Sequence, residues 1–155
     1  MPRTSDSLFE GKPLIEVAIS QANLSPSTVH PQQPAHTFPL RNYKALLDTG
    51  ATITCLSDSV VRECALQQFG LVRMFSGGGP NRHPSFIINL GIWCKESGDF
   101  EGAPEETRTL FQLAGAFEAV MIRDNHWFDV IIGMDIIQNH DLRMVKGGKF
   151  IFDLS

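Results

Sequence analysis

Residues 45–51 read ALLDTGA, so the triplet Asp48-Thr49-Gly50 directly follows an apolar run. A second apolar run, at residues 53–56, comes shortly after the triplet. Two such runs with a glycine between them predict two buried strands joined at a bend. Burying the carboxylate of Asp48 at this bend costs free energy unless another group compensates it. The triplet therefore marks Asp48 as a candidate catalytic residue, although an aspartate that caps an ordinary β-bend can give the same three letters.

Hydrolysis of a peptide bond by carboxylates needs two of them. One takes a proton from the attacking water, and the other protonates the departing nitrogen. Two carboxyl groups about 3 Å apart cannot both be ionised, so they share a proton and divide these roles. No other aspartate of the chain is followed by Thr-Gly or Ser-Gly. If Asp48 is catalytic, we expect its partner to be the same residue of a second subunit across a two-fold axis.

A second stretch, VIIGMDII at residues 130–137, supports this interpretation. It consists of an apolar run, Gly133, one further residue, Asp135 and another apolar run. Together with residues 45–51, it resembles the two signatures of the retropepsins, the single-domain aspartic proteases of retroviruses and retroelements and their cellular and bacterial relatives. The resemblance extends over roughly residues 14–152. It implies a mostly-β fold, the closed β-barrel of the acid proteases with one or two short helices, which is active as a two-fold dimer.

The resemblance also implies roles for individual residues. The second signature packs beside the catalytic strand, so the residues that support Asp48 are Thr49, Gly50, Gly133 and Asp135. The Thr49 hydroxyl can hydrogen-bond across the pair, and for Asp135 we expect a structural role rather than catalysis. A hairpin at 71–90, with a glycine-rich tip at 76–84, becomes a flap that closes over the substrate. The residues expected to bind substrate are Gly50, Ala51, Thr52, Gly77, Gly78 and Gly79.

A phosphate-binding loop is the alternative for the three flap glycines. Such a loop ends in Gly-Lys-Ser or Gly-Lys-Thr and leads into a helix. The chain has neither feature after Gly79, where a proline follows. A hairpin tip is therefore the better interpretation.

The rest of the chain predicts many short strands and two brief helices. Strands are expected at 14–19, 43–47, 53–56, 71–75, 85–90, 107–113, 118–122, 128–132 and 149–152. Helices are expected at 58–66, with Ser57 as its N-cap, and at 136–139. Residues 22–39 form a loop, since four prolines exclude a helix or a central strand there. These elements form one domain at 14–155, preceded by a polar leader at 1–13.

The composition argues against several other classes of protein. The chain has 155 residues and a formal charge of -4, with its Lys and Arg residues scattered singly, so no nucleic-acid partner is expected. No apolar run approaches the ~20 residues of a membrane span, and residues 1–12 lack the apolar stretch of a secretory signal. We therefore expect a cytoplasmic protein without a membrane partner. Three cysteines and five histidines without metal-ligand spacing predict reduced thiols, no metal and no cofactor.

Two functions are compatible with these features. The first is an aspartic endopeptidase that cuts an extended polypeptide between two identical subunits, using water activated by the pair of Asp48 carboxylates. The second is a dimer of the same fold that is catalytically silent or processes only itself, and that acts as a peptide-binding or scaffold module. The intact triplet favours the first, because a close carboxylate pair costs stability and is seldom kept without a use. The long segments at 22–39 and 95–106 keep the second open.

Overall fold

The computed structural model describes residues 2–22, 40–76, 79–95, 108–124 and 127–154. This part of the chain is mostly β, with two short helices, α1 (Asp58–Glu63) and α2 (Met134–Ile137). Its strands are β1 (Arg3–Ser7), β2 (Leu14–Gln21), β3 (Arg41–Leu47), β4 (Cys55–Ser57), β5 (Gln68–Ser76), β6 (Gly79–Lys95), β7 (Arg108–Gln112), β8 (Phe117–Ile122), β9 (Val130–Ile132), β10 (Asp141–Val145) and β11 (Lys149–Asp153). The proline-rich loop, from residue 23 on, lies outside the described residues.

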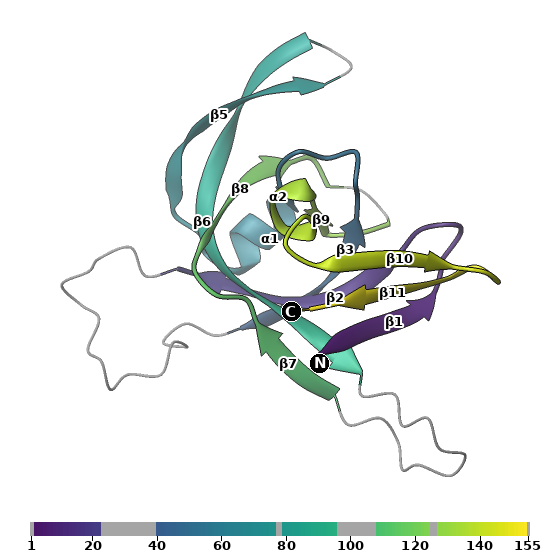
Figure 1. The fold of residues 1–155 in the computed structure, drawn as a ribbon. Coiled ribbons are helices and arrows are strands. Elements are labelled where there is room, and N and C mark those ends of the chain that lie inside the picture. Colours follow the sequence, from purple (N-terminus) through teal and green to yellow (C-terminus); the bar gives the residue numbers. More distant parts are fainter. Residues whose placement is uncertain (1, 23–39, 77–78, 96–107, 125–126, 155) are drawn as a thin grey trace, which may run out of the picture.

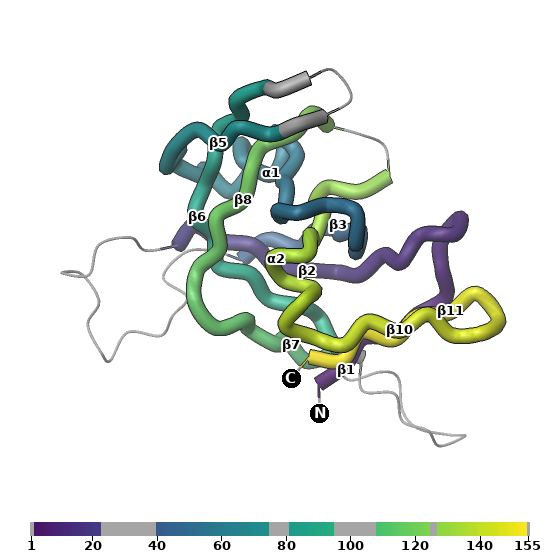
Figure 2. The backbone as a smooth tube through the Cα atoms, turned by 45° about the horizontal axis from the view of Figure 1, so that its top comes forward, coloured from purple at the N-terminus to yellow at the C-terminus, as the bar shows by residue number. Residues whose placement is uncertain are grey.

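Six strands close into a barrel in the order β2-β3-β9-β4-β8-β6, because β6 pairs with β2 as well as with β8. Alternate side chains fill its interior, among them Val17 and Ile19 of β2 and Ile88 and Leu90 of β6, all 0% exposed. Each buried side chain of this size contributes about 1.5–3 kcal/mol to folding. The smooth trace in Figure 2 shows the strands wrapping around this core. The predicted closed, mostly-β barrel with short helices is confirmed.

The β5–β6 hairpin is longer than predicted. β5 pairs with β6 from Gln68↔Phe86 to Ser76↔Gly79, so the turn predicted over 76–84 is wrong for Ser76 and for residues 79–84, which are strand. Prolines suggested a turn there, but β8 leaves β6 at Ser85 and opens one edge of the strand. A proline, which lacks an N–H, is tolerated at such an edge. Figure 1 shows the resulting hairpin rising from the barrel.

A second, smaller sheet has the order β1-β11-β10. The sequence predicts its central strand, β11, but neither neighbour. β1 falls in the segment 1–13 that was predicted as a leader, and it pairs with β11 from Arg3↔Asp153 to Ser7↔Lys149. β1 is polar throughout, and β10 has the sequence DLRMV, which lacks a long apolar run. The apolar residues of β11, Phe150 and Phe152, are 0% exposed and attach the sheet to the barrel core.

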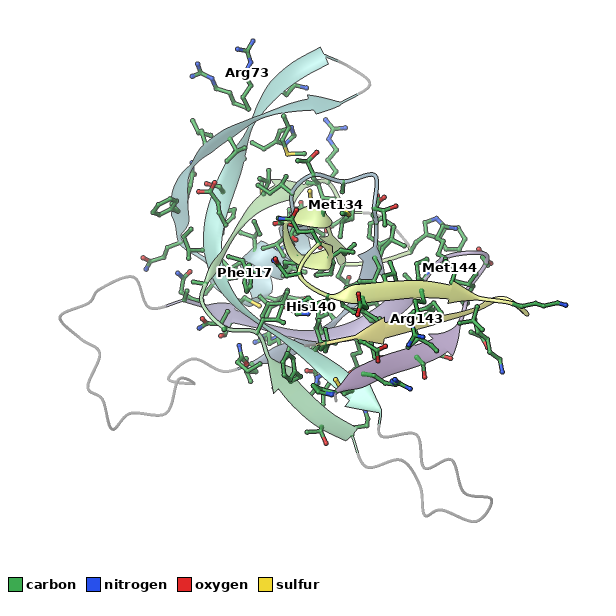
Figure 3. The ribbon with its side chains drawn as sticks, viewed as in Figure 1. Arg73, Phe117, Met134, His140, Arg143 and Met144 are labelled. Carbon is green, nitrogen blue, oxygen red and sulfur yellow. The ribbon has the colours of Figure 1, made fainter. Side chains whose placement is uncertain are left out.

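Asp153 joins the three strands of this small sheet. Its side chain is only 8% exposed, and it accepts bonds from Arg3 Nε of β1 at 2.7 Å and from Arg143 Nη2 of β10 at 2.6 Å. Arg143 is labelled on β10 in Figure 3. Burial disfavours the charged carboxylate, but the hydrogen bonds and charges of the two arginines outweigh burial and lower the pKa of Asp153. The ionised form of Asp153 therefore stabilises the sheet.

Acidification should remove this stabilisation. Because the pKa of Asp153 is lower in the folded than in the unfolded chain, its contribution is complete above the unfolded value of about 3.9 and is lost as the pH falls through the folded value. We expect Asp153→Asn to lower the free energy of unfolding by roughly 1–3 kcal/mol at neutral pH and to flatten its decrease below about pH 4. Urea unfolding at several pH values measures both effects. The exposed carboxylate control, Glu10→Gln, should change neither, and an equal effect in the control would refute the role of Asp153.

All three cysteines are free, with Cys55 and Cys94 buried and Cys64 half-buried. Of the helices in the described part of the chain, neither has the length and apolar character needed to cross a membrane.

Candidate active site

Asp48 lies where β3 leaves the barrel. β3 pairs in parallel with β9, up to Leu47↔Ile132, and the N–H of Asp48 extends this ladder by donating to the carbonyl of Ile132 at 3.0 Å. β9 pairs on its other side with β4. The second signature strand is therefore inserted between the two strands that flank the Asp-Thr-Gly triplet. The chain must bridge this gap from β3 to β4, and residues 48–54 form the connecting loop.

The carboxylate of Asp48 is held by its own loop. Its Oδ1 accepts a bond from the N–H of Gly50 at 2.8 Å, and its main-chain carbonyl accepts one from Ala51 at 3.1 Å. A Cβ at position 50 would lie 3.1 Å from this Oδ1, so glycine allows the carboxylate to approach closely. Asp48 is half-buried, whereas Thr49 and Gly50 are exposed. The loop therefore presents a fixed carboxylate to the surface.

Asp135, the first acidic residue of α2, ties the loop to the second signature. Its Oδ2 accepts from the N–H of Thr54 at 3.0 Å, and its Oδ1 accepts from the Thr54 hydroxyl at 2.8 Å. That hydroxyl in turn accepts a bond from the N–H of Gly133 at 3.2 Å. Thr54 is 0% exposed, so this network is shielded from water. Both ends of the 48–54 loop are thus fixed, one by β9 and the other by Asp135.

Two further main-chain bonds close the same contact. Met134 donates its N–H to the carbonyl of Ala51 at 2.8 Å, and Asp135 donates its N–H to Thr52 at 3.3 Å. Figure 3 shows Met134 on α2 beside the loop that follows β3. The first N–H groups of α2 therefore donate to the loop. These bonds order Ala51 and Thr52 through their carbonyls and leave their side chains free of this role.

Gly133 makes this close approach possible. A Cβ at this position would lie 2.7 Å from the carbonyl carbon of Ile53, 2.8 Å from its oxygen and 2.9 Å from the oxygen of Ala51. All three are backbone atoms, which cannot rotate away as the end of a side chain can. The glycine is therefore required by contact with the loop, while its φ of -91° is open to any residue.

Removing the Thr54 hydroxyl tests the network. Thr54→Val keeps the shape of the side chain but leaves the N–H of Gly133 and one oxygen of Asp135 without this partner. We expect the free energy of unfolding to fall by about 2 kcal/mol. Thr52→Val, in which the side chain is exposed, is the matched control and should change stability by less than about 0.5 kcal/mol. Chemical denaturation of both variants measures the difference, and equal losses would argue against the network.

Cys55 lies close to both carboxylates. Burial, followed by the negative charges of Asp135 and Asp48, raises the pKa of its thiol to about 11. The thiol is therefore neutral at physiological pH and is a poor nucleophile. Cys55 serves as an apolar wall of the site, and the two carboxylates remain its charged groups.

The structure brings most of the predicted site residues together. One cluster, formed by the 48–54 loop and the start of α2, contains Asp48, Thr49, Gly50, Ala51, Thr52, Gly133 and Asp135. Gly79 begins β6 at the far end of the hairpin, and Gly77 and Gly78 lie outside the described residues. Thr54 was not predicted from the sequence. Its signal was a hydroxyl inside the apolar run 53–56, where a polar group needs a partner.

Within the described ranges, no group of three or more His, Cys, Asp or Glu side chains is placed to hold a metal ion. Asp48 and Asp135 belong to one cluster, yet both oxygens of Asp135 are engaged by Thr54. The chemistry open to this cluster is that of a carboxylate fixed at the surface by the main-chain N–H of Gly50.

No protein-family model matches the sequence. No curated protein sequence matches it either. Among solved structures, the chain is similar to a retropepsin-like aspartic protease from Rickettsia conorii. The two share 12% sequence identity and superpose with a TM-score of 0.49, over 97% of this chain and 89% of that one. What the site can do is therefore argued from its own residues and contacts.

Proposed function

We propose that this chain is an aspartic endopeptidase that acts as a homodimer, with one Asp48 from each subunit. The observation that carries the proposal is the bond from the Gly50 N–H to Asp48 Oδ1 at 2.8 Å, in a loop fixed at both ends. A main-chain donor of this kind fixes the orientation of the carboxylate that must take a proton from water. The half-buried position of Asp48 leaves it within reach of a substrate at the surface.

The second carboxyl group has to come from another subunit. Asp135 belongs to the same cluster, but its Oδ1 and Oδ2 both accept bonds from Thr54 inside the protein. It is therefore committed to holding the loop. A second copy can bring its own Asp48 against the first across a two-fold axis, where the exposed Thr49 hydroxyls can bond across the pair.

In this mechanism Asp48 carries out proton transfer, and the residues that follow it in the loop bind the substrate. The ionised Asp48 accepts a proton from the attacking water, while the protonated Asp48 of the other subunit donates to the leaving nitrogen. Gly50, Ala51 and Thr52 form the floor on which an extended substrate lies. The β5–β6 hairpin covers the substrate from above and excludes water.

Cleavage of a diverse peptide mixture between acid and neutral pH tests the proposal, using the dimer fraction from a sizing column. We expect cuts at a limited set of sites and a maximum of activity with pH, since one carboxyl group must be ionised and the other protonated. A folded dimer that cuts nothing, yet binds peptides, would instead favour the peptide-binding module. A folded chain that stays monomeric at high concentration would contradict the paired mechanism.

A further inference from the structure

The sheet divides at the base of the β5–β6 hairpin. β6 pairs with β8 from Ile88↔Phe117 to Ser85↔Val120 and no further. Beyond this fork, β5 is the only neighbour of β6 among the described strands, while β8 continues beside β4. Figure 1 shows the hairpin leaving the barrel in this region. Any bond that joins β6 to β8 at the fork therefore influences how the hairpin stands over the 48–54 loop.

Pro84 interrupts the ladder at the fork. If the register continued, Pro84 would lie opposite Met121. The N–H of Val120 donates to Thr54 on the β4 side at 3.1 Å, so the backbone groups of the next residue, Met121, face β6. Pro84 has no N–H to offer the Met121 carbonyl. The ladder cannot continue by its usual bond.

The imidazole of His83 takes the place of the missing donor. Its Nδ1 lies 3.2 Å from the carbonyl oxygen of Met121, and since a carbonyl only accepts, Nδ1 carries the proton. Its Nε2 is buried and has no hydrogen-bond partner among the described residues. Burying that nitrogen costs free energy, which the bond made by Nδ1 offsets. The ring thus has one specific polar contact, and it lies at the fork.

His83 is on the face of the sheet that carries the catalytic loop. By register, Cys55, Val120 and Ser85 lie side by side on β4, β8 and β6, so their side chains share one face. His83, two residues from Ser85, shares this face as well. Cys55 of the same row lies close enough to Asp48 to respond to its charge. Arg73, on the other face of the hairpin, points away from the barrel in Figure 3.

We propose that His83 is a latch that holds the β5–β6 hairpin at its base through the Nδ1–H bond to Met121 and so sets its position for closing over a substrate. This inference rests on the proposed function. His83 is a positioning residue and takes no part in the chemical step. Its effect on catalysis passes through the hairpin, and therefore through binding of the peptide.

Three variants test whether the donor must lie at the position of Nδ1 or whether any polar side chain at residue 83 is enough. His83→Leu removes the donor. In His83→Asn the amide nitrogen occupies the place of Nδ1, whereas in His83→Gln it extends to the place of the unbonded Nε2. Phe86 and Ala119 are the pair nearest the fork whose backbone groups face each other, and their amides should exchange hydrogens about fivefold to tenfold faster in the Leu and Gln variants. The Asn variant should exchange at the wild-type rate.

A second-site change gives an independent test. Pro84→Ala restores a main-chain N–H opposite Met121, so His83→Leu with Pro84→Ala should return to the wild-type exchange rate. If Asn and Gln behave alike, if His83→Leu leaves exchange unchanged, or if Pro84→Ala fails to restore it, the latch is refuted. In peptide cleavage, His83→Leu should raise KM severalfold with kcat nearly unchanged. A chain that cleaves nothing in any form would refute the proposed function, whereas the exchange rates would still decide whether the latch exists.

Discussion

Asp48→Asn is expected to lower kcat/KM for peptide cleavage by at least about 10⁴-fold, because it removes the base and the acid together and each contributes about 10²–10⁴-fold. Asparagine keeps the size of the side chain and an oxygen that can still accept the bond from Gly50. The fold and the dimer should therefore survive. Initial rates on a peptide chosen from the cleaved mixture measure the loss, with circular dichroism and a sizing column as checks on folding and association.

Mixing this variant with wild-type chain tests whether the two carboxylates come from different subunits. With random exchange at equal amounts, only a quarter of the dimers keep both aspartates, so activity should fall to about half of that given by the wild-type chain alone. A ninefold excess of Asp48→Asn should lower it to about a tenth. Unchanged activity would mean that each chain works alone. Glu10→Gln chain, which keeps Asp48 and the whole 48–54 loop, is the control and should add activity to the mixture.

The barrel could be predicted because its strands are apolar runs whose periodicity is visible locally. The run at 43–47 became β3, and the run at 149–152 became β11. β1 and β10 were missed for the opposite reason. Neither has a long apolar run, and each forms because it pairs with β11, where Asp153 holds both through Arg3 and Arg143. Such strands depend on a partner far along the chain, which local patterns do not reveal.

The site divides in the same way. The triplet at Asp48 and the signature around Gly133 are each readable as short motifs. Their connection is a contact between Thr54 and Asp135, which are 81 residues apart, and no local rule places one hydroxyl against that carboxylate. The hairpin was misjudged at 79–84 because proline and glycine usually mark turns. Pro84 is tolerated in β6 because β8 diverges from β6 there and leaves an open edge. At the same place the Met121 carbonyl lacks a main-chain donor from β6, and His83 supplies one.

Among substitutions that add one methyl group to the site, Gly133→Ala should destabilise the folded protein most. The added Cβ would meet backbone atoms of Ile53 and Ala51 at 2.7–2.9 Å, so the 48–54 loop and α2 must move apart. We expect the free energy of unfolding to fall by about 3 kcal/mol. Gly70→Ala is the matched control, because its Cβ would meet only the Ser85 hydroxyl at 3.4 Å. Denaturant unfolding of the two variants gives the comparison, and a loss no larger than in the control would show that the loop is not closely packed on Gly133.

The same variant shows whether Gly133 contributes only to the stability of the fold or also to the alignment of the Asp48 carboxylate. Measured at a temperature where Gly133→Ala is fully folded, catalysis should still be reduced, by about 10²-fold, since a displacement of about 1 Å in a catalytic group has this effect. The displacement reaches Asp48 through Ala51, whose carbonyl accepts from Met134 and whose N–H donates to Asp48. A folded variant with normal kcat would mean that the loop position is set by β9 alone. A folded variant with low kcat would show that the second signature aligns the carboxylate as well as supporting the fold.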